Sequence, residues 1–339
     1  MGKLWLNNEI VDRLAMIQQA ETDHPGINQV AIEKDWWVTI TLKALFQTDC
    51  HESLLFKGGT SLSKGFNIIE RFSEDIDLSI SHSFFGIEKT TKNQREKLRK
   101  AARKYIHDTL SAQLDSQLKA MGLSGYNIEN VSQVQDKDGG YQSIASDKDP
   151  TVILLHYPSI LENAISYIPP RVKIEISCLS MEEPTEERSI HSLIGESFEG
   201  EDSDVECKIR TVVPTRTFLE KLFLLAEEFQ KDNPRSVRMS RHLYDLEKLM
   251  DTEYGHAALA DRSLYDAIIE HRKTYYALNY VDYDLHAPDT INFMIPEQSK
   301  DAWKADYADM RNFFIYGDSL EFDALMQRMK ELQERVRLL

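Results

Sequence analysis

The chain has 339 residues, of which 42% are hydrophobic, and a formal net charge of −16. This length allows a substantial core and more than one lobe. No apolar run is long enough to cross a bilayer, and the first residues lack the apolar stretch of a signal peptide, so we expect a cytoplasmic protein without a membrane segment. So acidic a chain repels nucleic acid at long range, which excludes binding of nucleic acid through overall charge alone.

Three cysteines lack the spacing of metal ligands, which favours reduced thiols. Along the chain, residues 7–48 carry apolar side chains at helical spacing and are predicted to form helices.

Residues 53–82 carry the most informative pattern in the sequence. A short apolar strand leads into a double-glycine turn and two hydroxyl residues that open a helix, with Leu62, Phe66 and Ile69 at helical spacing. Glycine lets a backbone approach a phosphate closely, and a helix start offers free N–H groups. The predicted phosphate-binding residues are Lys57, Gly58, Gly59, Thr60 and Ser61.

A second strand in this segment carries Asp75 and Asp77. Residues two apart on a strand project from the same face, so these carboxylates are expected side by side. Carboxylates next to bound phosphates make a site for Mg²⁺, a hard cation that prefers oxygen ligands. The combination predicts nucleotidyl transfer, whereas either part alone is common in ordinary turns and exposed strand ends.

Residues 88–122 are predicted to form a long charged helix or helix pair that ends near Gly122. Its basic side chains suit either a solvated face or an RNA contact. They are Lys89, Lys92, Arg95, Lys97, Arg99, Lys100, Arg103 and Lys104. Residues 125–180 then change to short runs rich in β-branched residues, which predict strands.

Glu175 is the predicted third carboxylate. Its neighbours Ile174 and Ile176 should point to the opposite face of the strand, into the core. Two-metal nucleotidyl transfer uses several carboxylates, one of which can also take the proton of the attacking hydroxyl. A solvent-facing glutamate on an edge strand is the alternative, and Lys173 is its expected neutralising partner in either case.

After Pro214 the chain is predicted to be nearly all helix. The sequence therefore favours an N-terminal α/β catalytic lobe over residues 1–213 and a helical lobe over residues 214–339, with the active cleft between them. The first lobe divides into a helical lead-in (1–50), a catalytic core (53–82 and 165–180) and an insertion (85–165).

The segment from Lys57 to Leu78 resembles the signature of the AbiEii/AbiGii-type nucleotidyltransferase toxins of type IV toxin–antitoxin and phage-defence systems. The likeness extends to Ile32–Trp37, to the strand that bears Glu175, to two helical motifs and to the C-terminal helical tail with Ile315-Tyr316-Gly317. It implies an α+β fold with a nucleotidyltransferase lobe like that of DNA polymerase β and a C-terminal helical lobe.

The two helical motifs supply further site residues by resemblance, namely Lys221, Arg241 and Asp245. A lysine can bind a triphosphate as a point charge, although Lys221 also suits a surface lysine that covers apolar side chains. Asp245 is expected to orient Lys221 or Arg241 or to accept a proton, or else merely to pair with Arg241 or His242. Arg235, Arg238 and Arg241 form a second positive cluster.

The resemblance implies transfer of NMP from an NTP to the 3′ end of tRNA, which would block translation. Asp75, Asp77 and Glu175 would hold two Mg²⁺ ions, with Mn²⁺ as a substitute, and pyrophosphate would leave. A cognate antitoxin encoded nearby is the expected partner, with a winged-helix regulator as one candidate. Two alternatives stay open, which are nucleotidylation of a protein hydroxyl and a nucleotide-binding interaction module without turnover.

Overall fold

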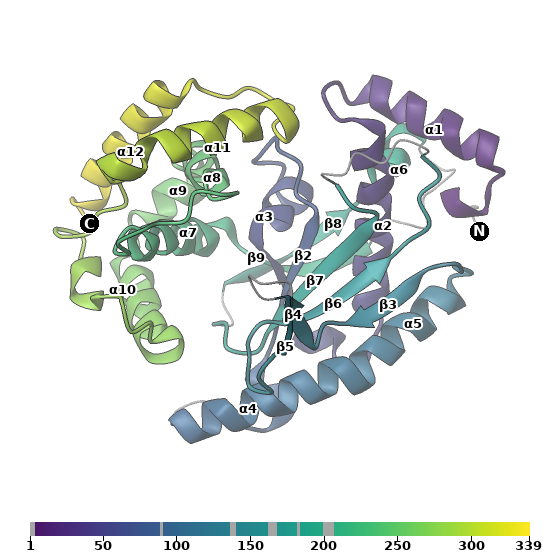
Figure 1. Cartoon of the computed structure of the whole chain (residues 1–339), viewed down its shortest axis with the longest axis horizontal. Coiled ribbons are helices and arrows are strands. Elements are labelled where there is room, and N and C mark those ends of the chain that lie inside the picture. Colours follow the sequence, from purple (N-terminus) through teal and green to yellow (C-terminus); the bar gives the residue numbers. More distant parts are fainter. Residues whose placement is uncertain (1–3, 89–90, 136–139, 162–167, 182–183, 199–206) are drawn as a thin grey trace. The chain divides into compact units, whose positions relative to one another are not determined.

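The computed structural model describes residues 4–88, 91–135, 140–161, 168–181, 184–198 and 207–339 (Figure 1). These residues form two compact units. Unit 1 contains Met1–Gly65 and Ser73–Thr211, and unit 2 contains Phe66–Phe72 and Val212–Leu339. The division of the chain into two lobes between residues 213 and 214 stays a prediction. The segment 66–72, which was expected in the catalytic core, lies in unit 2.

A mixed seven-stranded sheet forms the centre of unit 1, with strand order β3-β6-β7-β2-β1-β9-β8. The central strand β2 is antiparallel to β1 and parallel to β7. The strand bounds are β1 Leu54–Lys57, β2 Asp75–Ile80, β3 Asn127–Asn130, β6 Thr151–His156, β7 Arg171–Ser177, β8 Thr185–Ile190 and β9 Cys207–Val212.

Alternation along β2 and β7 gives this sheet two different faces. Ile76, Leu78, Ile174 and Ile176 are fully buried, whereas the charged residues between them stay partly exposed. Helix α2 (Gln29–Leu45) packs against both strands, and 15 of its 17 residues are buried. The charged face is therefore the one on which β2 and β7 can meet a ligand.

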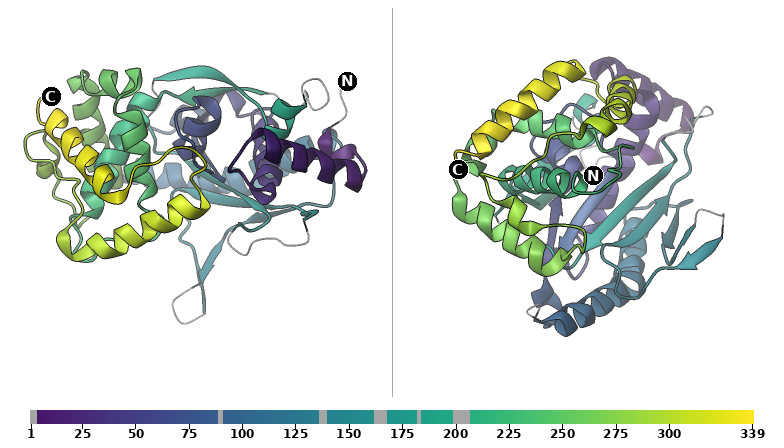
Figure 2. Two further views of the ribbon diagram at one scale, coloured as in Figure 1. Left: turned by 90° about the horizontal axis from the view of Figure 1, so that it is seen from above. Right: turned by 60° about the vertical axis from the view of Figure 1, so that its left-hand side comes forward.

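The remaining helices of unit 1 follow the predicted pattern. Helix α4 begins with a capping box between Thr91 and Gln94, and the chain stays helical to Ala120, just before Gly122 at φ +84°. The helix bounds are α1 Ile10–Asp23, α3 Gly58–Thr60 with η3 Ser61–Gly65, α4 Lys92–Tyr105, η5 Ile106–Leu110, α5 Ser111–Ala120 and α6 Leu193–Ser197. Both views in Figure 2 show the hairpin of β4 (Gln133–Gln135) and β5 (Tyr141–Ser143) projecting from the sheet.

Unit 2 is helical apart from one short pairing. Arg71 forms an antiparallel bridge with Ile315, which brings the segment 66–72 onto the helices. The element bounds are α7 Pro214–Glu228, α8 Arg241–Leu249, α9 Glu253–Ala258, α10 Arg262–His271, η7 Arg272–Tyr276, η8 Tyr283–His286, η9 Glu297–Ser299, α11 Lys300–Phe313 and α12 Phe322–Val336.

The structure confirms a mixed α+β fold with a helical C-terminal region, and it confirms the predicted helices within residues 7–48 and 88–122. The predicted helix through Phe66 and Ile69 is wrong, because helical structure ends at Gly65 and Asn67 adopts φ +52°. Both apolar side chains are instead buried in unit 2, where Phe66 packs edge-on against Tyr254.

No helix in the described part of the chain is both long and apolar enough to span a membrane. Cys50, Cys178 and Cys207, all among the described residues, form no disulfide.

Candidate active site

The predicted carboxylates of unit 1 lie in one row across the charged face of the sheet. Asp77 is in register with Glu175 on β7 and with Lys57 on β1. Asp75 is in register with Lys173, two residues away along the same face. Because residues in register on neighbouring strands point to the same side, the sheet brings these acidic and basic side chains together.

The double-glycine turn fits closely against this row. Gly58 adopts φ +82°, a conformation that favours glycine. A Cβ atom at this position would lie 2.1 Å from Oδ2 of Asp77. The carboxylate of Asp77 therefore packs directly against the Gly58 backbone, and glycine is required here for both backbone shape and space.

The hydroxyl groups after this turn are used within the protein. Thr60 donates to the Asp75 carbonyl, and its hydroxyl oxygen lies 2.9 Å from that of Ser73, while Ser61 donates to the Gly58 carbonyl at 2.9 Å. Both side chains are fully buried. Through these contacts the two side chains fix the shape of the turn.

The basic side chains of this face already have partners. Lys173 Nζ lies 2.6 Å from Glu175 Oε1, and both side chains are partly exposed. Lys57 Nζ donates to the Ser180 hydroxyl at 2.9 Å. The expected pairing of Lys173 with Glu175 is therefore present in the structure.

Asp75 and Asp77 fit a hard divalent cation in donor chemistry, because they supply carboxylate oxygens on one partly exposed face. Within the described ranges, however, no three His, Cys, Asp or Glu side chains gather closely enough to hold a metal ion. Glu175 is bound to Lys173, so the donor set present in this arrangement is the aspartate pair.

Unit 2 contains a second candidate group, centred on Asp245 of α8. Asp245 is fully buried, and Arg71 donates to both of its oxygens, from Nε to Oδ1 at 2.7 Å and from its terminal nitrogen to Oδ2 at 2.8 Å. Lys221 of α7 places its Nζ 2.8 Å from the same Oδ2. Two cations against one carboxylate leave this group, the Arg71–Lys221–Asp245 cluster, with a net charge of +1.

These contacts decide the protonation states within the cluster. Burial alone would raise the pKa of Asp245, but Arg71 and Lys221 hold it well below its usual range. Burial lowers the pKa of Lys221, an effect that Asp245 opposes and Arg71 reinforces. A carboxylate so firmly ionised is a weak proton acceptor, so the geometry favours Asp245 as the group that orients Lys221.

Arg71 is the residue of this cluster that we did not predict from the sequence. Its segment is held by Phe314–Gly317, since the Phe72 N–H donates to the Phe314 carbonyl at 2.7 Å and the Tyr316 N–H donates to the Glu70 carbonyl at 3.0 Å. A Cβ on Gly317 would lie 2.1 Å from the Glu70 carboxylate. The Ile315-Tyr316-Gly317 motif therefore has a local function, which is to hold the strand that carries Arg71.

The two arginines that precede α8 contact acidic side chains through their backbone N–H groups. The Arg235 N–H donates to Glu228 at 2.7 Å, and the Arg238 and Ser240 N–H groups both donate to Asp306 of α11. Arg241 begins α8 and is close enough to Lys221 to lower its pKa. Arg241 thus adds positive charge next to the Arg71–Lys221–Asp245 cluster, whereas Arg235 contacts Glu228.

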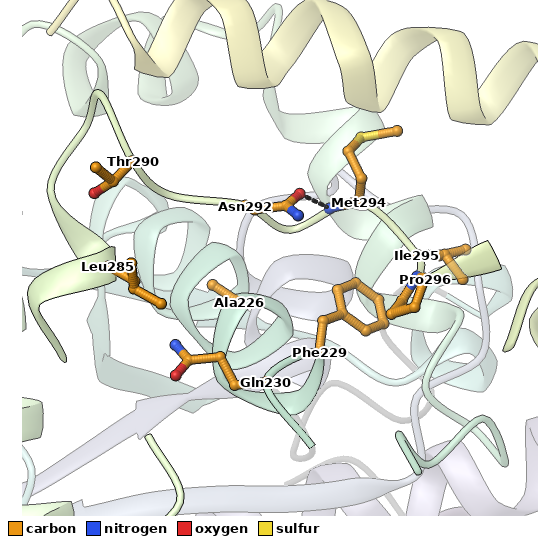
Figure 3. A pocket seen from close by; sticks show the side chains of 9 residues that line it. All are labelled: Ala226, Phe229, Gln230, Leu285, Thr290, Asn292, Met294, Ile295 and Pro296. Atoms are coloured by element: carbon orange, nitrogen blue, oxygen red, sulfur yellow. Dashed lines mark hydrogen bonds between the residues drawn. The ribbon is translucent and has the colours of Figure 1, made fainter. Parts of the chain in front are cut away.

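A separate cavity of about 280 Å³ lies in unit 2 (Figure 3). No charged side chain lines it, and Asn292 is tied to the Met294 N–H at 3.0 Å. The lining residues are Ala226, Phe229, Gln230, Leu285, Thr290, Asn292, Met294, Ile295 and Pro296. None of them belongs to the candidate site residues, and the lining does not suit a triphosphate.

Comparison with known proteins assigns the chain to a family. The sequence matches the family described as "Nucleotidyl transferase AbiEii toxin, Type IV TA system" over residues 40–328. Among solved structures it is similar to MenT4, a nucleotidyltransferase toxin from Mycobacterium tuberculosis, with 15% identity and a TM-score of 0.44 over 96% of this chain and 98% of that one. No match was found among curated proteins. Because the family match spans most of its length, the chain belongs to the AbiEii family of nucleotidyltransferase toxins of type IV toxin–antitoxin systems.

Proposed function

We propose that this nucleotidyltransferase toxin transfers NMP from an NTP to a hydroxyl of an acceptor and releases pyrophosphate. The observation that carries the proposal is the row of Asp77 and Glu175 in register, with Asp75 on the same face and Gly58 packed against Asp77. In the reaction the acceptor oxygen bonds to the α-phosphorus as the bond from that phosphorus to the pyrophosphate oxygen breaks. A carboxylate of the row takes the proton of the hydroxyl.

Asp75 and Asp77 are the proposed ligands of a divalent metal, Mg²⁺ or Mn²⁺, and Glu175 would join them on leaving Lys173. A pair of such ions, when bound, offsets negative charge on the attacking and leaving oxygens. The protein holds the two aspartates ready for this, because β2 is paired on both sides and cannot shift its register without breaking two ladders.

The phosphates are proposed to bind the backbone of Gly58 and Gly59, with Lys57 beside them. Thr60 and Ser61 support that backbone through their buried hydroxyl contacts. A glycine turn without Cβ atoms permits this close approach, and Gly58 is the position where a side chain would collide with Asp77.

Lys221 and Arg241 are proposed to neutralise the charge that builds on the leaving pyrophosphate. Asp245 holds Lys221 in place, Arg71 holds Asp245, and the cluster keeps excess positive charge. Arg71 and Asp75 are separated by only three residues of chain, so this cluster and the acidic strand are connected through the backbone.

The 3′ end of tRNA is the acceptor we propose, because family membership implies a toxin and an acceptor stem carries a terminal hydroxyl. Blocking it would stop translation in the cytoplasm, and a cognate antitoxin, with a winged-helix regulator as one candidate, would restrain the reaction. Some basic side chains of helix α4 have partners within the protein. Lys100 pairs with Glu96 and Lys104 with Asp108, while Arg103 donates to the Val131 carbonyl. Lys89 lies outside the described residues.

A protein hydroxyl is the second candidate acceptor. The net charge of −16 and the internal pairing of α4 favour it, since neither hinders approach of a protein as it hinders RNA. One experiment distinguishes the acceptors, in which the protein is incubated with Mg²⁺, each α-labelled NTP in turn, total bacterial RNA and a protein extract treated with nuclease. Label in a tRNA-sized band supports the proposal, and label in protein alone replaces it with protein nucleotidylation.

A different test distinguishes an enzyme from a nucleotide-binding module without turnover. Its cellular effect should persist in Asp77→Ala, provided the variant still folds, whereas an enzyme loses the effect. The intact row of Asp75, Asp77 and Glu175 favours the enzyme.

A further inference from the structure

The chain leaves unit 1 after Gly65 and returns to it at Ser73, and the residues between belong to unit 2. This crossing segment, residues 66–72, carries Arg71, the main partner of Asp245. Lys64 stands just before the crossing and Glu74 just after it, immediately ahead of Asp75. A positive and a negative side chain, Lys64 and Glu74, thus flank the crossing segment.

Both charges are paired with two consecutive residues of one helix. Lys34 of α2 places its Nζ 2.6 Å from Glu74 Oε2, and Asp35 pairs through Oδ1 with Lys64. All four side chains are at most 10% exposed. A single turn of α2 therefore holds the point of exit and the point of return of the crossing segment.

Further contacts fix Lys34 and Asp35 themselves. Lys34 also donates to the Pro169 carbonyl at 3.3 Å, in the turn that leads into β7. Oδ2 of Asp35 accepts from the Leu193 N–H at 2.8 Å. Helix α2 is buried along nearly its whole length, so neither side chain can swing away to solvent.

Buried ion pairs are a poor means of adding stability, because the cost of removing both charges from water offsets their attraction. Apolar residues of similar size do as well or better in such places, and a pair that is retained points to a need for defined geometry. Burial lowers the pKa of Lys34, while the nearby carboxylates of Glu74 and Asp75 act in the opposite direction. The Lys34–Glu74 pair thus fixes the residue that directly precedes Asp75, the proposed metal ligand.

We propose that Lys34 and Asp35 are positioning residues that fix both ends of the crossing segment and so set the placement of Asp75 at the start of β2. The inference rests on the proposed function, in which Asp75 holds the metal. The Lys34-Asp35 dipeptide would thus act through its ion pairs with Glu74 and Lys64.

The test compares Lys34→Met, Asp35→Asn and the double variant Lys34→Met/Glu74→Leu with wild type. Glu33→Gln is the matched control, because Glu33 is fully buried on the same helix but binds Ser159 and the Ile160 N–H rather than the crossing segment. Hydrogen exchange of amides 64–75 and the Mg²⁺ dependence of kcat are measured for each, normalised to the folded fraction.

We expect at least a tenfold loss of kcat, a higher Mg²⁺ half-saturation and faster exchange across residues 64–75 in the three variants, with threefold change or less in Glu33→Gln. The double variant removes both buried charges together and should fold even where Lys34→Met does not. It therefore distinguishes a loss of activity caused by misplacement of Asp75 from one caused by unfolding. A double variant with wild-type kcat and wild-type exchange would overturn the inference. Wild type that labels no acceptor would instead refute the proposed function, and the exchange measurement would still decide whether Lys34 and Asp35 hold the segment.

Discussion

Arg71 and Asp245 are 174 residues apart in the sequence and joined by two parallel hydrogen bonds of 2.7 and 2.8 Å. This forked geometry matches a guanidinium to a carboxylate and is stronger than contact with a point charge. Since Lys221 binds the same carboxylate, the pair connects α7, α8 and the segment 66–72 through one buried acid. Asp245 therefore holds Arg71 and Lys221 together.

Arg71→Met should destabilise the protein, because it leaves buried Asp245 with Lys221 as its single cation. Breaking a buried pair in this way typically costs about 3–5 kcal/mol, and urea unfolding would measure the loss. Arg71→Lys should give an intermediate value, since it keeps the charge without the fork. The control is Arg262→Met, which breaks an exposed pair with Asp266 and should unfold as wild type does. A loss for Arg71→Met as small as that of the control would contradict the assigned role of Arg71.

Gly58→Ala should abolish most activity through a collision at the site. The new Cβ meets Asp77 Oδ2, and displacement of a reacting group by about 1 Å can lower the rate on the order of a hundredfold. Gly122→Ala is the matched control, because Gly122 has a similar φ of +84° but nothing within 4 Å of its Cβ position. Both variants should lose roughly 1 kcal/mol from backbone strain, while only Gly58→Ala loses nucleotidyl transfer. Equal activity in the two would show that Asp77 does not need its present position.

The alkaline side of the pH–rate profile should report Lys221. Burial lowers its pKa, so the charged amine is lost at a pH below the usual lysine value of about 10.4. Activity that needs the charged amine should therefore decrease with rising pH before the pH reaches about 10.4. Lys221→Arg should move this decrease to higher pH. In the same range the unfolded chain binds more protons at this site than the folded one, so the contribution of Lys221 to stability rises with pH. An unchanged profile in Lys221→Arg would remove Lys221 from the proposed mechanism.

Acid should unfold the protein partly through Asp245. Its pKa is depressed in the folded state, so its stabilising contribution is complete above the unfolded value of about 3.9 and is lost as the pH falls toward the folded value. The free energy of unfolding measured between pH 6 and pH 2 should fall more steeply for wild type than for Asp245→Asn. Parallel curves would mean that other carboxylates account for the acid sensitivity.

The sequence was sufficient where the chemistry is local. The spacing of two residues on a strand placed Asp75 and Asp77 on one face, and the flanking isoleucines placed Glu175 on its strand. The register that aligns Asp77 with Glu175 depends on the pairing of two strands and could not be predicted from either one. The helices of residues 7–48 followed from apolar spacing, because their buried side chains lie against neighbours in the same unit.

The sequence was insufficient where contacts join distant segments. Ile69 matched a helical stripe, yet it is buried in unit 2 after the helix has ended at Gly65. Arg71 carried no local signal, since its partners Asp245 and Ile315 follow far along the chain. The contact of the Thr60 hydroxyl with the Asp75 carbonyl likewise joins two segments and had no signal in the sequence.

Asp75 and Asp77 of β2 are the carboxylates on which nucleotide transfer is proposed to depend. The most direct measurement incubates wild type and Asp75→Ala/Asp77→Ala with Mg²⁺, each α-labelled NTP and total bacterial RNA, after unfolding curves have shown that both proteins are folded. We predict label in a tRNA-sized band with wild type and none with the double variant. Equal label in both would contradict the account, because transfer would then proceed without the carboxylates assigned to it.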